Sequence, residues 1–389
     1  GEKATLTNTG TIDIKGQEST GMFAKSSSKM INKGTINLIA STSADKPNIG
    51  MFTEDENTEI ENNKDIIGGN NTYGIYGKTV SLTGTGKIEL GDASVGIFSD
   101  AEYTSTPAVA TIDLANGSKL KVGAKESVGV FATGKNQNIS SKGDIEVGDT
   151  SFAFVVRGTG TTLKTDNTNG VTLGNDATFI YSNDTTGNIE NKTALTATGS
   201  KNYGIYASGE ITNLADMDFS AGVGNVGILN VRDIGSTTSK AVNGQLGAAS
   251  QPTITVGKSD VINENYSIGM AAGYLDKDGV LKQTGHVENY GKIDVVGEGG
   301  IGMYATGSGS KAINHAGAEI NLSGQDSIGM YLTDSAIGEN YGTIRTAPNN
   351  TKDGIVGVVA NNNAVIKNYG TIEIKGEGNT GILLANGGD

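Results

Sequence analysis

The sequence predicts an all-β fold, a right-handed parallel β-helix in which one segment, residues 1–389, winds through about fourteen rungs of three short strands. Three observations lead to this fold class. A unit of about 28 residues recurs along the whole chain. Apolar and polar residues alternate within the unit, which is typical of half-buried strands. Glycine supplies 59 of 389 residues, about twice its usual share.

The most regular part of the repeat is a six-residue anchor of the form S-x-G-M-Y-A, as in SIGMYL from Ser327 and SVGIFS from Ser94. Its apolar and aromatic composition predicts a strand, and no helical periodicity surrounds it. We expect its apolar residues to point inward and to stack on their equivalents one rung away. The glycine position of the anchor falls at residues 21, 50, 74, 96, 129, 153, 179, 204, 227, 269, 302, 329, 357 and 381.

A second motif, N-x-G-T-I-x-I-x-G, precedes the anchor and is clearest in KNYGTIEIKG from Lys367. Its alternation predicts a strand, and asparagine and glycine suit the tight corners of a rung because they tolerate left-handed backbone. We expect the corner asparagines to form a buried ladder that satisfies backbone groups. These asparagines are Asn8, Asn32, Asn191, Asn289, Asn314, Asn340 and Asn368.

The variable position of T-I-x-I should face solvent and form a column along the helix. Of its fourteen residues only Ile67 is apolar, and no two carboxylates are neighbours in the column. This spacing favours stacked rungs, because like charges on adjacent strands repel. The column reads Asp13, Asn37, Ile67, Glu89, Lys121, Glu146, Thr172, Thr196, Asp218, Thr255, Asp294, Asn321, Arg345 and Glu373.

Three segments interrupt the repeat, near residues 99–110, 230–251 and 272–286. All three are expected to leave the same corner of a rung. The last two lie on consecutive rungs and should therefore protrude side by side. Loops on a rigid frame often carry binding residues, although a surface insertion also costs a solenoid little stability.

The two neighbouring insertions provide the candidate ligand-binding residues. Cationic and anionic side chains could contact polar groups of a partner, with the tyrosine as an aromatic anchor. These residues are Arg232, Asp233, Lys240, Tyr274, Asp276, Lys277 and Asp278. The run from Asp276 to Gly279 resembles the start of a calcium loop but lacks its later ligands, so we interpret it as a β-turn.

Composition argues against several classes of function. The net charge is −13 and only three arginines occur, which disfavours nucleic acid as a partner. With no cysteine and two histidines, His286 and His315, no metal site and no cofactor are expected. The apolar stretches are too short to span a membrane, so no membrane contact by this segment is expected. No signal peptide is visible, and we expect targeting and anchoring segments to lie outside this slice of a longer protein.

The motifs I-x-N-Y-G-T-I-x-I-x-G and S-x-G-M-Y-A resemble the passenger repeats of large fusobacterial-type autotransporter adhesins, over essentially the whole chain. The resemblance implies a non-enzymatic, extracellular adhesin segment that binds protein or glycan receptors on other bacteria or host cells. It also implies anchoring to the outer membrane through a C-terminal barrel that is not part of this chain.

Two alternatives to an adhesin stay open. The first is a polysaccharide-degrading β-helix, which needs either paired carboxylates or carboxylates on calcium with a basic residue. The outward column offers Glu89 and Glu146 with Lys121 between them, but we interpret these as a solvated alternation of charge. The second is an inert spacer stalk, for which the regular scaffold alone would suffice.

Overall fold

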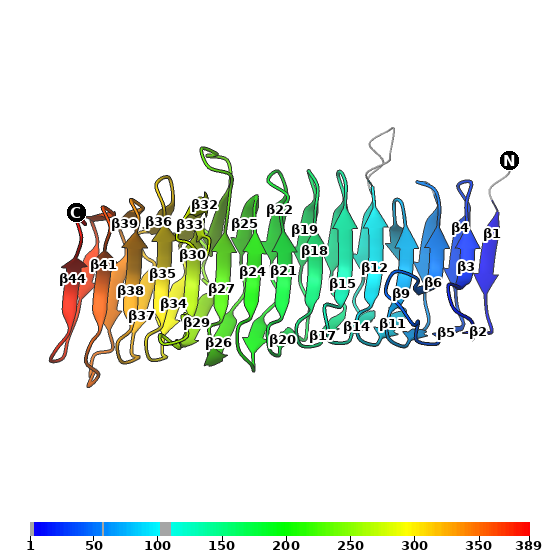
Figure 1. The fold of residues 1–389 in the computed structure, drawn as a ribbon, viewed down its shortest axis with the longest axis horizontal. Helices are drawn as coiled ribbons and strands as arrows, with labels where there is room; N and C mark the ends of the chain where they lie inside the picture. Colours follow the sequence, from blue (N-terminus) through cyan, green and yellow to red (C-terminus); the bar gives the residue numbers. More distant parts are fainter. Residues whose placement is uncertain (1–3, 57, 102–109) are drawn as a thin grey trace. The chain divides into compact units, whose positions relative to one another are not determined.

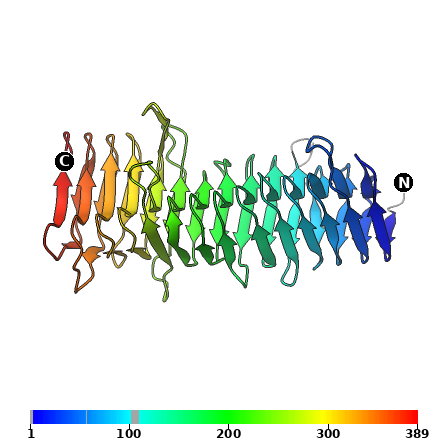
Figure 2. The ribbon, with the colours of Figure 1, turned by 60° about the horizontal axis from the view of Figure 1, so that its bottom comes forward.

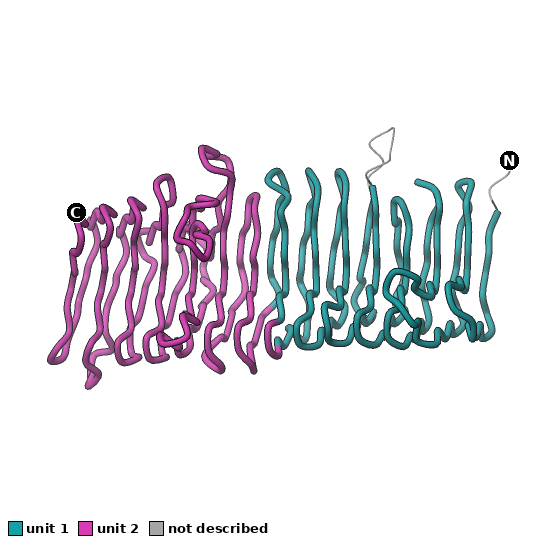
Figure 3. Tube along the Cα trace, in the orientation of Figure 1, with its two compact units in different colours: residues 1–173, 177–193 teal, residues 174–176, 194–389 magenta. Residues whose placement is uncertain are grey.

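The protein is described from a computed structural model that defines residues 4–56, 58–101 and 110–389. Every regular element in these ranges is a β-strand, and all the sheets but one small hairpin are parallel. The chain divides into two compact units, residues 1–173 with 177–193 and residues 174–176 with 194–389 (Figure 3). Within each unit, successive rungs stack as parallel strands (Figure 1). The predicted all-β, right-handed parallel β-helix is confirmed.

Each complete rung of unit 1 contributes one strand to each of three sheets, in the chain order sheet 1, sheet 2, sheet 3. Sheet 1 contains β1 (Thr5–Asn8), β4 (Lys29–Asn32), β7 (Glu59–Asn62), β10 (Ser81–Thr83), β13 (Thr111–Leu114), β16 (Asn138–Ser141), β19 (Thr162–Thr165) and β22 (Asn188–Asn191). Sheet 2 contains β2 (Thr11–Ile14), β5 (Thr35–Leu38), β8 (Ile66–Gly68), β11 (Lys87–Leu90), β14 (Lys119–Val122) and β17 (Asp144–Val147), and its ladder stops before β20 (Val171–Leu173). Sheet 3 holds the anchors, in β3 (Thr20–Ala24), β6 (Asn48–Thr53), β9 (Thr72–Gly77), β12 (Val95–Asp100), β15 (Val128–Thr133), β18 (Phe152–Val156) and β21 (Thr178–Ser182).

Unit 2 repeats the three-sheet plan. Its sheet 1 contains β25 (Glu210–Asn213), β28 (Lys240–Asn243), β33 (His286–Asn289), β36 (Lys311–Asn314), β39 (Ile337–Asn340) and β42 (Val365–Asn368). Its sheet 2 contains β23 (Leu195–Ala197), β26 (Met217–Val223), β29 (Thr253–Lys258), β34 (Lys292–Val295), β37 (Glu319–Leu322), β40 (Thr343–Thr346) and β43 (Thr371–Glu373). Its sheet 3 contains β24 (Tyr203–Ala207), β27 (Val226–Asn230), β30 (Ile268–Ala272), β35 (Ile301–Thr306), β38 (Ile328–Thr333), β41 (Val356–Ala360) and β44 (Thr380–Leu384). With seven anchor strands in each unit, the count of about fourteen rungs is confirmed.

The core of each rung is filled by the isoleucines of T-I-x-I and the fourth residue of the anchor. In unit 2, Ile293, Met303 and Ile320 are completely buried, and Ile293 pairs in register with Ile320 one rung away. Burial of such side chains contributes roughly 1.5–3 kcal/mol each. The interior is therefore a set of apolar columns and not a single globular centre.

The core prediction is wrong for the fifth residue of the anchor, whose aromatic ring points outward, whereas Phe154 and Phe179 at other anchor positions are completely buried, as predicted. In unit 1, Phe52, Tyr76 and Phe98 lie on the outer face of sheet 3 and are half-buried. Their rings contact one another from rung to rung, edge-on for Phe52 and Tyr76 with centroids 5.3 Å apart and stacked for Tyr76 and Phe98 with centroids 4.8 Å apart. Aliphatic side chains fill the interior of most rungs, and Phe154 and Phe179 pack edge to face inside it with centroids 5.5 Å apart.

The anchor glycine is required by the close approach of neighbouring rungs. A Cβ atom built on Gly302 would lie 2.6 Å from the carbonyl oxygen of Gly329, and one on Gly50 would lie 2.6 Å from the carbonyl oxygen of Gly74. Real Cβ atoms do not approach carbonyl oxygens so closely. The repeated glycine therefore sets how tightly sheet 3 can stack.

The predicted asparagine ladder is confirmed, and its members are buried except Asn8, which is half-buried, and Asn368, which is exposed. In unit 2 each amide donates to the side-chain oxygen of the next asparagine: Asn289 to Asn314 at 3.0 Å, Asn314 to Asn340 at 2.9 Å and Asn340 to Asn368 at 2.7 Å. The oxygen of Asn289 also accepts from the backbone N–H of Gly291. Three further members, Asn62, Asn213 and Asn243, lie outside an N-x-G motif.

The outward column of sheet 2 is confirmed wherever pairing is defined. In unit 1 it runs in register from Asp13 to Glu146, and in unit 2 from Thr196 to Glu373. Neighbours in the column interact: the amide of Asn321 donates to Asp294 at 2.8 Å. The spacing of like charges thus reflects true stacking.

A tyrosine-lined groove as the candidate functional site

The predicted insertion at 230–251 is not one loop. Strand β28, residues Lys240–Asn243, divides it and belongs to sheet 1 like its counterparts in other rungs. Only residues 231–239 leave the corner between sheets 3 and 1, whereas residues 244–252 leave the next corner. The prediction of a single insertion is therefore wrong, because Asn243 at the end of the short strand KAVN is followed directly by Gly244 and does not show the N-x-G spacing.

The insertion at 272–286 folds into an antiparallel hairpin of β31 (Tyr274–Leu275) and β32 (Leu281–Gln283). The run from Asp276 to Gly279 is the β-turn predicted from sequence: the Gly279 N–H donates to the Asp276 carbonyl at 2.9 Å, and Gly279 has φ +76°. Of the insertion at 99–110, residues 102–109 lie outside the described residues.

The segments 231–239 and 273–285 lie side by side, as predicted, and project from unit 2 (Figure 2, yellow-green). Arg232 joins them. Its backbone exchanges two hydrogen bonds with Thr284, of 2.7 and 3.0 Å. Its guanidinium donates to the carbonyl of Ser239 at 3.1 Å and to the carbonyl of Gly309 at 2.9 Å. Because Arg232 is only 7% exposed, the expectation that it offers its charge to a partner is wrong, and it fastens the loops together.

The other predicted ligand-binding residues divide between two surfaces. Asp276, Lys277 and Asp278 share the hairpin turn, where they are engaged locally by ion pairs of 2.9 Å from Lys282 to Asp276 and 3.0 Å from Lys277 to Asp278. Asp233 is exposed on the neighbouring loop. Lys240 lies in β28 and contacts Glu288 on sheet 1.

Among the predicted ligand-binding residues, Tyr274 lines a cavity. It is 44% exposed and lines a groove of about 650 Å³ over the outer face of sheet 3 in unit 2. The floor is built from β30, β35 and β38. One wall is the hairpin, with Tyr274 and Leu275, and the other is the loop 260–267, with Tyr266.

Both walls belong to the rung of β30, which carries an insertion at each end. The loop 260–267 is closed by a pair of backbone hydrogen bonds between Asp260 and Asn265, each 2.9 Å. The hairpin is held at its base by the Arg232–Thr284 pair. The walls are thus fixed to the rungs and do not hang free.

In β30, beside the groove, an alanine replaces an anchor aromatic. Ala271 pairs in register with Tyr304, which pairs with Tyr331. The two tyrosine rings stack with centroids 5.9 Å apart and an interplanar angle of 20°. At Ala271 this aromatic column is interrupted, and Ala271 is buried in a cluster with Leu229 and Val231. Tyr266 and Tyr274 lie beyond the two ends of β30 and line the groove. The signal was present in the sequence as SIGMAA between two tyrosines, but only the fold shows that they surround one space.

The groove is aromatic and acidic. Burial raises the pKa of Tyr304, so its phenol stays protonated at neutral pH. Glu264 and Asp326 are the carboxylates of the lining, and none of the lining residues is a lysine or arginine. Neither carboxylate forms an ion pair within residues 4–56, 58–101 and 110–389. Both are free to accept hydrogen bonds from a ligand.

Unit 2 also contains a cluster of charged and titratable side chains. This Glu288 cluster consists of Lys240, His286, Glu288 and His315. The side chain of Glu288 is 8% exposed. Its carboxylate oxygens lie 3.3 Å from Lys240 Nζ, 3.2 Å from His286 Nε2 and 3.1 Å from His315 Nε2. Burial opposes its ionisation, but these three partners outweigh burial and hold the pKa of Glu288 well below its ordinary value. Both histidines of the chain therefore contact the same buried carboxylate, that of Glu288.

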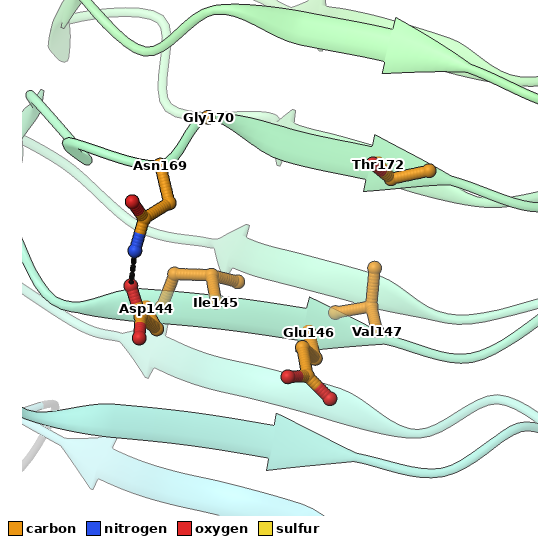
Figure 4. Close-up of a pocket in the computed structure, with 7 residues that line it drawn as sticks. All are labelled: Asp144, Ile145, Glu146, Val147, Asn169, Gly170 and Thr172. Carbon is orange, nitrogen blue, oxygen red and sulfur yellow. Dashed lines mark hydrogen bonds between the residues drawn. The ribbon is translucent and has the colours of Figure 1, made fainter.

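In unit 1, a polar hollow of about 410 Å³ lies where the sheet 2 ladder stops, between β17 and β20 (Figure 4). Asp144 accepts a hydrogen bond of 2.6 Å from Asn169 there (Figure 4). Glu146 is paired with Lys119 at 2.9 Å and Lys121 at 3.2 Å, and the hydrogen bond from Lys119 is the main cause that lowers its pKa. A general acid needs the opposite shift.

No cluster of histidine and carboxylate residues suited to a metal ion occurs within the part of the chain that the structure describes. In the same ranges, no helix is long and apolar enough to cross a membrane.

A parallel β-helix with its chemistry on outer faces and loops is the architecture of a pectate lyase-like domain. The chain belongs to the family of the third pectate lyase-like domain of BigA, which matches residues 1–65, 110–316 and 310–389. It is thus a β-helical passenger segment of an adhesin-like, surface-exposed protein. No curated protein and no solved structure matches the chain.

Proposed function

We propose that this segment mediates attachment of an autotransporter-type adhesin to receptors on other bacteria or on host cells. The observation that carries the proposal is the groove between Tyr266 and Tyr274, a shaped concavity on an otherwise regular β-helix of an adhesin-like family. A largely apolar concavity with a few placed polar groups is the usual form of a ligand site. We also propose that the segment is part of a fusobacterial-type autotransporter passenger and that the whole protein is anchored in the outer membrane.

We propose that the segment is not an enzyme. Hydrolysis of a polysaccharide needs a carboxyl group held protonated beside an ionised partner. Burial raises the pKa of Glu210, and the charge of Glu288 adds to the rise, so this pair is the best candidate for such chemistry. Glu288, however, is almost enclosed by His286 and His315. The pair also lines none of the cavities described above.

The test is adhesion by the isolated 389-residue chain. Beads coated with it are mixed with labelled bacteria and with epithelial cells, and bound cells are counted against uncoated beads. We expect binding above background, and loss of most of it when the short corner 332–335 replaces the hairpin residues 274–283. Circular dichroism should show the trimmed protein to be folded, because loop length contributes little to stability.

The alternatives give different results. A spacer stalk would leave the coated beads no more adhesive than the blank beads, which would contradict the proposal. An enzyme would release new reducing ends or unsaturated products from pectic or host glycans, and Glu288→Gln would abolish that release.

A further inference from the structure

We propose that the tyrosine-lined groove of unit 2 binds an uncharged oligosaccharide, whose sugar rings lie against the tyrosines while its hydroxyls donate to Glu264 and Asp326. This inference rests on the proposed function and names the class of receptor. The groove offers flat aromatic surface beside free hydrogen-bond acceptors, and a pyranose ring offers an apolar C–H face beside hydroxyl donors.

The geometry of the rings favours a chain of sugars. Tyr304 and Tyr331 repeat at the spacing of the rungs, with centroids 5.9 Å apart. Tyr266 and Tyr274, 40% and 44% exposed, stand at the two ends of the neighbouring strand. A ligand in the groove therefore meets aromatic surface below it and at both walls. Such contacts add to the area that aromatic side chains bury.

The charge of the groove decides which glycans fit. With two unpaired carboxylates and no cation among the lining residues, a uronic or sialic acid would be repelled. Uncharged hexoses and N-acetylhexosamines carry hydroxyl donors and no negative charge. The electrostatics thus select uncharged sugars over acidic ones.

A peptide strand fits less well. The floor strands β30, β35 and β38 already pair with one another, so the floor offers no open strand edge for an added strand. On the floor, a peptide would have to bind through its side chains alone. A lysine-rich peptide could still be attracted by the carboxylates, and the experiment includes one.

A continuation of the groove supports an extended ligand. Glu264, Tyr266 and Ile268 line both the groove and an adjoining cavity of about 400 Å³ that also contains Tyr203. In that cavity two carboxylates, Asp176 and Glu264, outnumber the one cation, Lys201. Tyr266 therefore stands between two connected spaces within unit 2. An oligosaccharide of several residues could fill both.

The experiment titrates the intact chain with cellohexaose, maltohexaose, chitohexaose, polygalacturonate and a lysine hexapeptide. Binding is followed by calorimetry and by tyrosine fluorescence, which is readable because the chain has no tryptophan. We expect at least one uncharged hexasaccharide to bind and polygalacturonate not to bind. Tyr266→Ala and Tyr274→Ala should each weaken that binding by about tenfold or more.

Tyr341→Ala is the matched control, because Tyr341 is 41% exposed but lies outside the groove, stacked on Tyr369. Its affinity should stay within about twofold of the original protein. Thermal melts that agree among the three variants exclude unfolding as the cause.

The inference is overturned if no uncharged hexasaccharide binds, if only the lysine peptide or polygalacturonate binds, or if Tyr341→Ala weakens binding as much as the groove variants. These results are separable from failure of the proposed function. Cell adhesion that persists without oligosaccharide binding keeps the adhesin and removes the glycan. Oligosaccharide binding without cell adhesion supports the glycan site and contradicts the proposed role in adhesion.

Discussion

The backbone of Arg232 pairs with the backbone of Thr284 through two hydrogen bonds, of 2.7 and 3.0 Å, and joins two loops from consecutive rungs. Thr284 closes the hairpin that carries Tyr274, and Tyr274 forms one wall of the groove. A residue that looked from sequence like a ligand contact thus positions the groove's wall. Its effect on binding should be indirect.

We first predict that Arg232→Ala lowers the stability of unit 2 by about 1–3 kcal/mol, because the carbonyls of Ser239 and Gly309 lose their buried donor. Asp233→Ala next to it, on an exposed residue, should change stability by less than about 0.5 kcal/mol. Denaturant unfolding measures both. Hydrogen exchange should be faster in the hairpin of the Arg232 variant, and unchanged protection there would contradict the role of Arg232 as a fastener.

Second, Ile293→Asp should cost several kcal/mol, because Ile293 is completely buried and its replacement places a carboxylate in the isoleucine column. Asp294→Asn should be nearly silent, since the remaining amide oxygen can still accept the hydrogen bond from Asn321. Circular dichroism melts compare the two. Equal shifts in melting temperature would mean that the inward and outward faces of β34 are misassigned.

Third, Gly302→Ala should destabilise unit 2 markedly, because its Cβ atom would lie 2.6 Å from the carbonyl oxygen of Gly329 and the rungs would have to separate. Gly381→Ala provides a control at the same anchor position, where no atom lies within 4 Å. The melting temperature of the 389-residue chain should fall for the first and stay unchanged for the second. A comparable fall for both would assign the cost to glycine's flexibility and not to the contact.

Fourth, unit 2 should lose stability in acid through Glu288. Its pKa in the folded protein is lowered below the ordinary value of 4.5, so its contribution is fully present above that value and decreases as the pH falls below it. Melts between pH 3 and pH 7 should show this decrease. Glu288→Gln should be less stable at pH 7 and should show a weaker dependence on acid; the same acid dependence in both proteins would rule out Glu288 as its source.

Much of the fold could be read from the sequence because stacking makes each rung repeat the constraints of the last. The N-x-G corners gave the asparagine ladder, and the polar residues of T-I-x-I gave the register of sheet 2. The features that the repeat did not predict are departures of single rungs from the consensus. Asn62 and Asn213 join the ladder without the motif, and the aromatic at the fifth anchor position faces outward, although Phe154 and Phe179 at other anchor positions lie in the core.

The candidate site could be predicted only in part from the sequence. The sequence by itself determined that the rungs near β30 carry insertions and that Tyr274 lies on one of them. Only the tertiary structure decided that Arg232 is buried, that Lys240 belongs to sheet 1 and that Tyr266, Tyr274, Tyr304 and Tyr331 surround one space. The physical reason is that a repeat specifies what each rung does alone, whereas a groove depends on the side chains of several rungs and the direction in which irregular loops leave them.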